Sequence, residues 1–337
     1  MIEVTEALAL QMSGTNRLVC LEALKRGWKV KVPYVPSGQM FFDRGDGRDV
    51  HVFSAVPPAT SYADAHLADD KYATYIRLVE ANIPQLESVL VGRDESLQDA
   101  TDLIDRVKKV VVKPVDGGHG KGITVNVSSE QQLSAAVEVA KSFKKSISGV
   151  LVQEQFEADE MHDIRVAVID GKFVAALERV PARVFGDGEH TVGQLIELEN
   201  NKPERGEPYR AKLARIDITA AQRYLGGAIE NIPAAGEEVR VLGVANYGAG
   251  GELVDVTDDV PSWMRDEAVQ AAKTLKLSVP GVDYMVDRPL LASYGREDIQ
   301  AVIVEVNKSP SLAIHDEPTV GQSRDVIPQY LDFIASL

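Results

Sequence analysis

The order of apolar and polar positions in the first part of the chain predicts a helix, a strand and a hairpin. Residues 14–27 carry apolar side chains at helical spacing and end at Gly27, which is a typical residue for a helix end. Residues 29–35 then predict a strand that stops before Pro36. Residues 41–53 predict a further hairpin, because a glycine- and aspartate-rich turn separates two apolar runs.

A second helix is expected from 69 to 81. We expect one face of this helix to be formed by Tyr72, Tyr75, Ile76 and Val79. A strand near 89–91, a helix near 96–107 and the apolar run 110–112 follow it. Strands and helices alternate from there to the end, so the pattern predicts an α+β or α/β fold.

Composition and charge narrow the class of protein. The 337 residues are 45% hydrophobic, as in a globular protein, and no apolar run approaches the roughly 20 residues that cross a bilayer. The 36 Lys and Arg residues face 51 Asp and Glu residues, a formal charge of -15. Such a surface disfavours nucleic acids and anionic membranes as partners. Cys20 is the single cysteine and the first residues lack a signal-peptide pattern, so we expect a cytoplasmic protein.

The most informative stretch is the glycine-rich segment 110–127, VVVKPVDGGHGKGITVNV. Glycine allows backbone N–H groups to approach phosphate oxygens closely. A P-loop is excluded because Lys121 is followed by Gly122 instead of Ser or Thr. A dinucleotide fingerprint is excluded because the alternating residues 123–127 predict a strand and not a helix. Strand, loop and strand describe a hairpin that can cover phosphates, or alternatively an exposed turn without a ligand.

Two groups of charged residues suggest partners for such phosphates. Lys113 ends an apolar run, where its charge calls for a phosphate or, alternatively, a neighbouring carboxylate. Glu305 and Asn307 are two apart on an expected strand and point to one face, and Asp283 lies on another apolar strand. Two carboxylates and an amide suit magnesium. The alternative is that the two acids pair with arginines such as Arg288 or Arg324.

Together these motifs resemble the ATP-grasp superfamily, and most of all the ATP-grasp part of cyanophycin synthetase and of bifunctional glutathione synthetase. The likeness runs over nearly the whole chain, through the segments 112–126, 154–156, 163–192, 233–237, 246–251, 254–258 and 305–326. It implies an ATP-grasp fold in which two α+β subdomains clasp ATP. Residues 1–70 would form a small N-terminal domain, 71–149 the lid subdomain, and 150–337 the large subdomain with the magnesium site.

The resemblance also implies roles for individual residues. Lys71 and Lys113 are the expected phosphate contacts. The lid over the phosphates is expected to be formed by Gly117, Gly118, His119, Gly120 and Gly122. The adenine hinge falls on Glu154, Gln155 and Phe156, and the ribose contact on Asp163, with Glu160 as an alternative. The magnesium ligands, which manganese could also use, are Asp283, Glu305 and Asn307.

Two arginines match catalytic positions of this superfamily, and a third is a candidate replacement for an arginine that this sequence lacks. Arg179 is expected to face the acyl-phosphate or the acceptor, and Arg165 falls in a matching position on the preceding strand. A structural ion pair is the alternative for both. Leu242 stands where the relatives have an arginine, and Arg240, on the same expected strand face, is a candidate replacement.

The implied activity is that of an ATP- and magnesium-dependent ligase. It would join a carboxylate to an amine through an acyl-phosphate, using amino acids or short peptides and releasing ADP and phosphate. Two alternatives remain open: a kinase of the same fold, and a nucleotide-binding protein without catalysis. A homo-oligomer, dimer or tetramer, is compatible with the resemblance. His315 matches a histidine of the relatives, and the two alternatives for it are a place in the wall of the acceptor pocket and a structural role.

Overall fold

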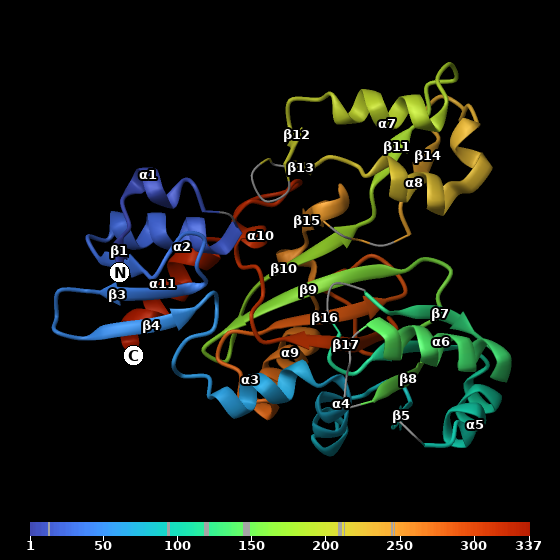
Figure 1. Ribbon diagram of the computed structural model, residues 1–337, viewed down its shortest axis with the longest axis horizontal. Coiled ribbons are helices and arrows are strands. Elements are labelled where there is room, and N and C mark those ends of the chain that lie inside the picture. Colours follow the sequence, from blue (N-terminus) through green and yellow to red (C-terminus); the bar gives the residue numbers. More distant parts are fainter. Residues whose placement is uncertain are drawn as a thin grey trace.

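The computed structural model describes residues 1–12, 14–92, 95–117, 121–143, 149–207, 211, 213–243, 245 and 247–337. Figure 1 shows three sheets side by side, with a lobe of helices and short strands above the middle one. Two of these sheets face each other and position the candidate site. Within the described residues, no helix is long and apolar enough to cross a bilayer.

The first sheet and the last helix of the chain form one unit. The sheet consists of β1 (Ile2–Glu3), β2 (Lys29–Val32), β3 (Gln39–Asp43) and β4 (Asp49–Phe53), in that order and antiparallel. The helices of the unit are α1 (Glu6–Ala9), α2 (Gly14–Lys25) and α11 (Val326–Ser336). Tyr330 and Leu331 of α11 share a core with Phe42 and Cys20. The expected helix and hairpin are confirmed, while the expected strand 29–35 ends at Val32.

The second sheet carries the glycine-rich loop. Its order is β5 (Ser88–Val91), β8 (Val150–Glu154), β6 (Val110–Pro114) and β7 (Thr124–Val127). Helices α5 (Gln98–Val107) and α6 (Glu130–Phe143) share a core with this sheet. The predicted strand, loop and strand are therefore present as β6 and β7. Because β8 pairs with both β5 and β6, the chain leaves this sheet after Glu154. The boundary expected from the sequence lies at 150, before β8.

The third sheet is the largest and forms the floor of the site. Its order is β15 (Glu252–Asp255), β10 (Lys172–Val180), β9 (His162–Ile169), β16 (Gly281–Val286) and β17 (Ala301–Asn307). Its companion helices are α3 (Tyr62–Asp69), α4 (Lys71–Glu80), α9 (Ser262–Thr274) and α10 (Ala313–Asp316). One face packs on α9 through a core that includes Tyr284, Ile164 and Ala268. The opposite face is therefore left for the cleft.

Helix α4 forms where it was predicted, but its expected apolar face is wrong. Thr74 and Leu78 are the buried residues of α4, and Ile76 and Val79 are exposed. The buried stripe follows Leu78, whose side chain joins the core of the large sheet. The helical spacing of aromatic and β-branched residues therefore predicted that a helix forms here, but it did not predict which face of the helix is buried.

A separate lobe rises from the large sheet between β10 and β15 (Figure 1). It contains β11 (Arg183–Phe185), α7 (Val192–Asn200), β12 (Arg205–Gly206), β13 (Leu213–Ala214), α8 (Ile218–Leu225), η1 (Gly226–Glu230), β14 (Glu238–Arg240) and η2 (Tyr247–Ala249). The short helix η3 (Thr257–Asp259) follows β15. Val184, Ile196 and Ala221 belong to a core that is the lobe's own. The capping box formed by Thr191 and Gln194 fixes the start of α7.

Candidate nucleotide and metal site

A cleft of ≈ 160 Å³ lies between the second and third sheets. Its lining comes from the start of α4, the end of β6, the glycine-rich loop and the facing strands of the large sheet: Lys71, Lys113, Pro114, Gly117, Lys121, Ile123, Asp163, Arg179, Asp283, Met285, Val304 and Glu305. Most of the charged residues in this lining were predicted from the sequence. The structure thus gathers residues from 71 to 305 into one place.

Two lysines face the cleft from the side of the lid. The Lys113 ammonium is buried and donates a hydrogen bond to Gln153 Oε1 at 2.8 Å. Burial, and then the charge of Lys71, lower the pKa of Lys113 to about 8. Lys71 Nζ lies 2.9 Å from Glu305 Oε1 and 2.6 Å from the carbonyl oxygen of Gly117. Lys113 therefore has an amide as its hydrogen-bond partner instead of the carboxylate that the alternative required, which leaves a buried cation suited to an anion.

The predicted magnesium ligands meet at the opposite wall. Asp283 of β16 and Glu305 of β17 are direct partners in the antiparallel register, so their side chains share one face of the sheet. Asn307 Nδ2 lies 3.3 Å from Asp283 Oδ2. In the described part of the chain, no three His, Cys, Asp or Glu side chains gather into a metal-binding group. Two carboxylates and an amide still fit magnesium, which completes its coordination with water and phosphate oxygens.

Asp283 is held by the two arginines that the resemblance singled out. Arg165 donates to both of its carboxylate oxygens, with Nη2 at 2.8 Å from Oδ2, and Arg179 Nη2 lies 3.0 Å from Oδ2. Burial alone would raise the pKa of Asp283, but the two guanidinium groups lower it below its ordinary value. The alternative that an acid of this group pairs with arginines is therefore confirmed for Asp283. The two arginines named as examples are wrong, since Arg288 pairs with Asp287 and Arg324 with Asp255.

Asp163 lies beside this cluster. Arg179 Nε is 3.0 Å from Asp163 Oδ1, and Arg179 lies opposite Asp163 in the register of β9 and β10. Burial raises the pKa of Asp163 to about 6, although Arg179 acts in the opposite direction. The alternative ribose residue, Glu160, is mostly exposed and lies 3.4 Å from the ring of His162.

The three expected hinge residues follow one another at the end of β8, outside the cleft lining. Glu154 exchanges hydrogen bonds with the backbone of Glu87, at 2.7 and 3.2 Å. The Gln155 amide bonds the backbone and side chain of Asn126 on β7, at 2.7 and 2.8 Å. Both side chains thus tie together strands of the second sheet, and Phe156 is half-buried next to them. Gly118, His119 and Gly120 lie outside the described residues.

The replacement suggested for the missing arginine is placed in the lobe. Arg240 is exposed at the end of β14, opposite Arg183 in the register, and is absent from the cleft lining. Leu242 is buried in the core of the lobe. The two side chains therefore do not share one environment, because β14 ends at the exposed Arg240 and Leu242 beyond it points into the core of the lobe.

Sequence reasoning missed the polar support beneath Lys113. Gln153 is buried, and its Nε2 donates to Ser88 Oγ at 2.9 Å while its Oε1 accepts from Lys113. An amide inside the apolar run that starts at Val150 was the available signal. Ile123, Met285 and Val304, three apolar members of the lining, had no signal that separated them from ordinary strand residues.

Comparison with known proteins bears on the fold and on the family resemblance. Residues 68–189 match the model of the RimK-like ATP-grasp domain. The chain is 34% identical over 278 residues to cyanophycin synthetase of Crocosphaera subtropica, covering 80% of this chain and 30% of that protein. It is 28% identical over 347 residues to the bifunctional glutathione biosynthesis protein of Listeria welshimeri, covering 99% of this chain and 43% of that protein. The chain thus spans less than half the length of these relatives.

A solved structure resembles the whole chain. The bifunctional glutathione synthetase of Pasteurella multocida superposes with a TM-score of 0.71 and 24% identity, covering 98% of this chain and 44% of that one. The chain has the ATP-grasp fold, and its residues 68–189 are similar to the RimK-like ATP-grasp domain. The expected fold class and family resemblance are confirmed.

Proposed function

We propose that the protein is an ATP-dependent ligase that joins a carboxylate to an amine through an acyl-phosphate. The observation that supports this most is the cleft between the two sheets, where Lys71 and Lys113 lie across from Asp283 and Glu305. Relatives named cyanophycin synthetase and glutathione biosynthesis protein support amino acids or short peptides as the substrate class. ATP and magnesium are the cofactors of the proposed reaction.

The residues of the cleft divide into two proposed roles. Lys71 and Lys113 bind the phosphates of ATP, and the glycine-rich loop covers them. Asp283, Glu305 and Asn307 hold magnesium, which when bound neutralises phosphate charge and orients the phosphates for transfer. Adenine and ribose lie toward the end of β8, where Glu154, Gln155 and Phe156 form the proposed hinge.

The ribose contact has two candidates. Asp163 points toward Arg179, which suits it to orienting that guanidinium. Glu160 lies in the segment between β8 and β9 and is open to solvent, so we favour Glu160 for the ribose.

The chemistry needs no covalent bond to the protein. The substrate carboxylate attacks the γ-phosphorus, the bond to the β,γ-bridging oxygen breaks, and ADP leaves. Arg179 and Arg165 stabilise the transferred phosphoryl group and the acyl-phosphate, since guanidinium groups pair bidentately with such oxygens. The amine then attacks the acyl carbon and phosphate leaves, with loss of one amine proton. Closure of the loop over the cleft keeps water from the acyl-phosphate.

The test is release of ADP and phosphate from ATP and magnesium, with amino acids and dipeptides supplied in pairs. We expect release that requires one carboxylate and one amine together, with stoichiometric formation of an amide. Glu305→Ala should lower kcat at least about 100-fold, as loss of one electrostatic contact to the transition state typically does. Glu130→Gln, an exposed carboxylate at the start of α6, is the matched control.

Other outcomes separate the alternatives. A stable phosphorylated product without free phosphate would identify a kinase of this fold. Tight ATP binding by calorimetry with no ADP release for any pair would contradict the ligase and favour a binding protein.

A further inference from the structure

His315 is a buried histidine that the reaction described above does not use. It lies on α10 and is 2% exposed, and within the described structure neither ring nitrogen has a hydrogen-bond partner. Burial, and then the charge of Arg165, lower its pKa to about 3, so the ring is neutral at pH 7. Asp255 and Asp283 are also within electrostatic reach of the ring. A buried polar ring without a partner persists only where the surrounding structure imposes it.

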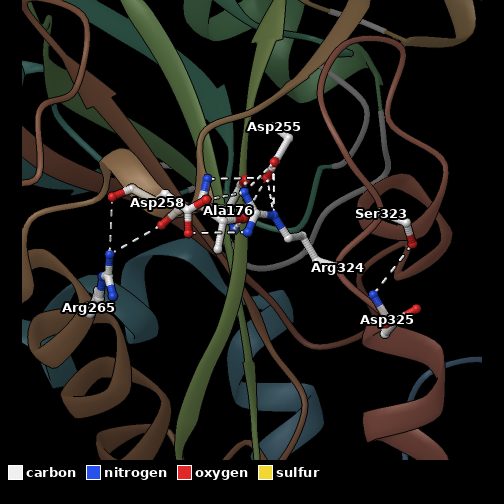
Figure 2. Close-up of polar contacts among 8 residues, drawn as sticks. Ala176, Asp255, Asp258, Arg265, Ser323, Arg324 and Asp325 are labelled. Atoms are coloured by element: carbon white, nitrogen blue, oxygen red, sulfur yellow. Dashed lines mark hydrogen bonds and ion pairs between the residues drawn. The ribbon is translucent and has the colours of Figure 1, made fainter.

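The structure that imposes it is the strap, residues 315–326, which runs from the last turn of α10 to the first residue of α11. Figure 2 shows Arg324 reaching from the strap to Asp255 at the end of β15 and to Asp258 beyond it. Arg324 Nη2 lies 2.5 Å from Asp255 Oδ2 and 2.7 Å from Asp258 Oδ2, and Nε also donates to Asp255. The backbone N–H of Arg324 donates to the carbonyl oxygen of His315 at 3.1 Å. One residue thus joins His315 to the edge of the large sheet.

The rest of the strap is fixed to the same edge. The backbone N–H of Thr319 donates to Leu253 at 2.8 Å, and that of Asp255 donates to Val320 at 2.9 Å, so the strap extends the sheet beyond β15. Gly321 has a φ of +94°, and a Cβ there would lie 2.6 Å from Asp255 Cβ. The strap therefore approaches Asp255 too closely for any side chain at that position.

The residue to which the strap is fastened, Asp255 of β15, lies in register with residues of the candidate site. Asp255 is the register partner of Leu177, and Leu177 is the partner of Arg165. Arg165 in turn is opposite Asp283, which is opposite Glu305. Side chains directly opposite in antiparallel strands share one face, so these residues form a row across all five strands. The proposed metal ligands occupy one end of the row, and the Arg324–Asp255 pair occupies the other.

We propose that Arg324 is a positioning residue for the carboxylate substrate. By fastening the strap to Asp255, it fixes His315 within electrostatic reach of Arg165, the middle residue of the row, and the strap forms the wall of the subsite for the substrate carboxylate. The uncharged ring adds no charge beside Arg165, whose guanidinium pairs with Asp283, while Arg179 of the same cluster lines the cleft that an anionic substrate would enter. The nucleotide phosphates contact Lys71 and Lys113, which come from other elements, so they are independent of the strap. The inference rests on the ligase function proposed above.

The experiment compares Arg324→Ala and Arg324→Lys with Arg288→Ala in the full chain. Arg288 is a matched control, because it also pairs with an aspartate but lies away from the strap and the cleft. We expect Arg324→Ala to raise KM for the carboxylate substrate about tenfold, as loss of an outer partner of a site residue does, with the dissociation constant of ATP within twofold. Hydrogen exchange of 315–326 should become faster. Arg324→Lys should recover part of the KM change, since lysine keeps the charge but not the bidentate contact.

A double variant tests whether the pair acts as a unit. Arg324→Ala combined with Asp255→Ala should raise KM no further than Arg324→Ala alone. The positioning role would be overturned if Arg324→Ala changed the affinities for ATP and for the carboxylate equally. It would also be overturned if the loss of activity were accounted for entirely by a smaller fraction of folded protein. Absence of turnover in the wild type would overturn the proposed function instead. In that case unchanged exchange of 315–326 in Arg324→Ala would still overturn the role of Arg324 in holding the strap.

Discussion

The Arg165 guanidinium holds both carboxylate oxygens of Asp283 across β9 and β16. Arg179 adds a third contact to the same carboxylate, at 3.0 Å. The carboxylate of Asp283, a proposed metal ligand, is therefore already paired with two guanidinium groups. A metal ion must compete with these guanidinium groups, and phosphate oxygens can help by drawing the arginines away.

We expect free Mn²⁺ to bind weakly without nucleotide, and Arg179→Ala to raise its affinity about tenfold. A hydrogen bond to a charged group contributes about 1.5–3 kcal/mol, and this energy corresponds to a change in affinity of at least about tenfold. Electron paramagnetic resonance of Mn²⁺ in the absence of ATP measures the effect directly. Arg183→Ala, which removes an arginine paired with Glu238 and Glu252 in the lobe, is the control. Identical affinities in the wild type and Arg179→Ala would show that the arginines do not compete with the metal.

ATP affinity should fall as pH rises through about 8, because the buried Lys113 loses its proton there. The charged form is present below that pH and binds phosphate, whereas the neutral form above it does not. Between pH 7 and pH 9 we expect a loss of about tenfold, since one pKa unit corresponds to about 1.4 kcal/mol. Binding near pH 8 should also take up a proton, which calorimetry in buffers of different ionisation enthalpy reveals.

The matched variant for this pH effect is Lys113→Arg. A guanidinium stays charged throughout this range, so its ATP affinity should show no step near pH 8. A step of the same size in Lys113→Arg would assign the titration to another group.

Restoring an arginine at position 242 should damage the protein instead of improving it. Leu242 is buried in the lobe core, so Leu242→Arg should lower the free energy of unfolding by about 3 kcal/mol. Urea denaturation measures this, and ADP release should not increase. Arg240→Ala, on the exposed end of β14, should change stability by less than about 0.5 kcal/mol and kcat by less than about twofold. A fall of about 100-fold in kcat would instead support the catalytic role predicted from the sequence.

Leu331→Ala should destabilise the first unit of the fold. Leu331 is completely buried between α11 and the first sheet, and removing such a side chain costs about 2–5 kcal/mol. Differential scanning calorimetry should show a lower transition temperature. The control is Leu198→Ala, because Leu198 is 52% exposed in the lobe. Equal transition temperatures for the two variants would mean that α11 contributes little to this core.

Local features of the site were the most predictable from sequence. The glycine-rich hairpin and the positions of Lys113 and Glu305 follow from alternation along single strands, which depends only on neighbouring residues. Pairs of residues that face each other across the sheet were harder to predict from the sequence. The pairing of Asp283 with Arg165 depends on the register of β16 against β9, which joins residues more than a hundred positions apart.

The same reason explains the remaining differences. The sheet to which β8 belongs is decided by its hydrogen bonds to β5 and β6, and not by its own apolar run. The buried face of α4 is decided by the core that Leu78 meets. No local pattern could show that Leu242 would face a lobe core with members such as Ile196 and Ala221. Tertiary contacts fix these features, and a single sequence shows only one side of each contact.

The shared core of the first sheet and α11 constrains how the chain folds as it is made. Residues 1–56 leave the ribosome well before residues 326–336, so the first unit must wait for its last helix. Its apolar face stays open while the two central sheets are synthesised, and long-range contacts of this kind form late. Nascent chains halted before residue 326 should therefore bind chaperones through 1–56, and should release them once α11 has emerged.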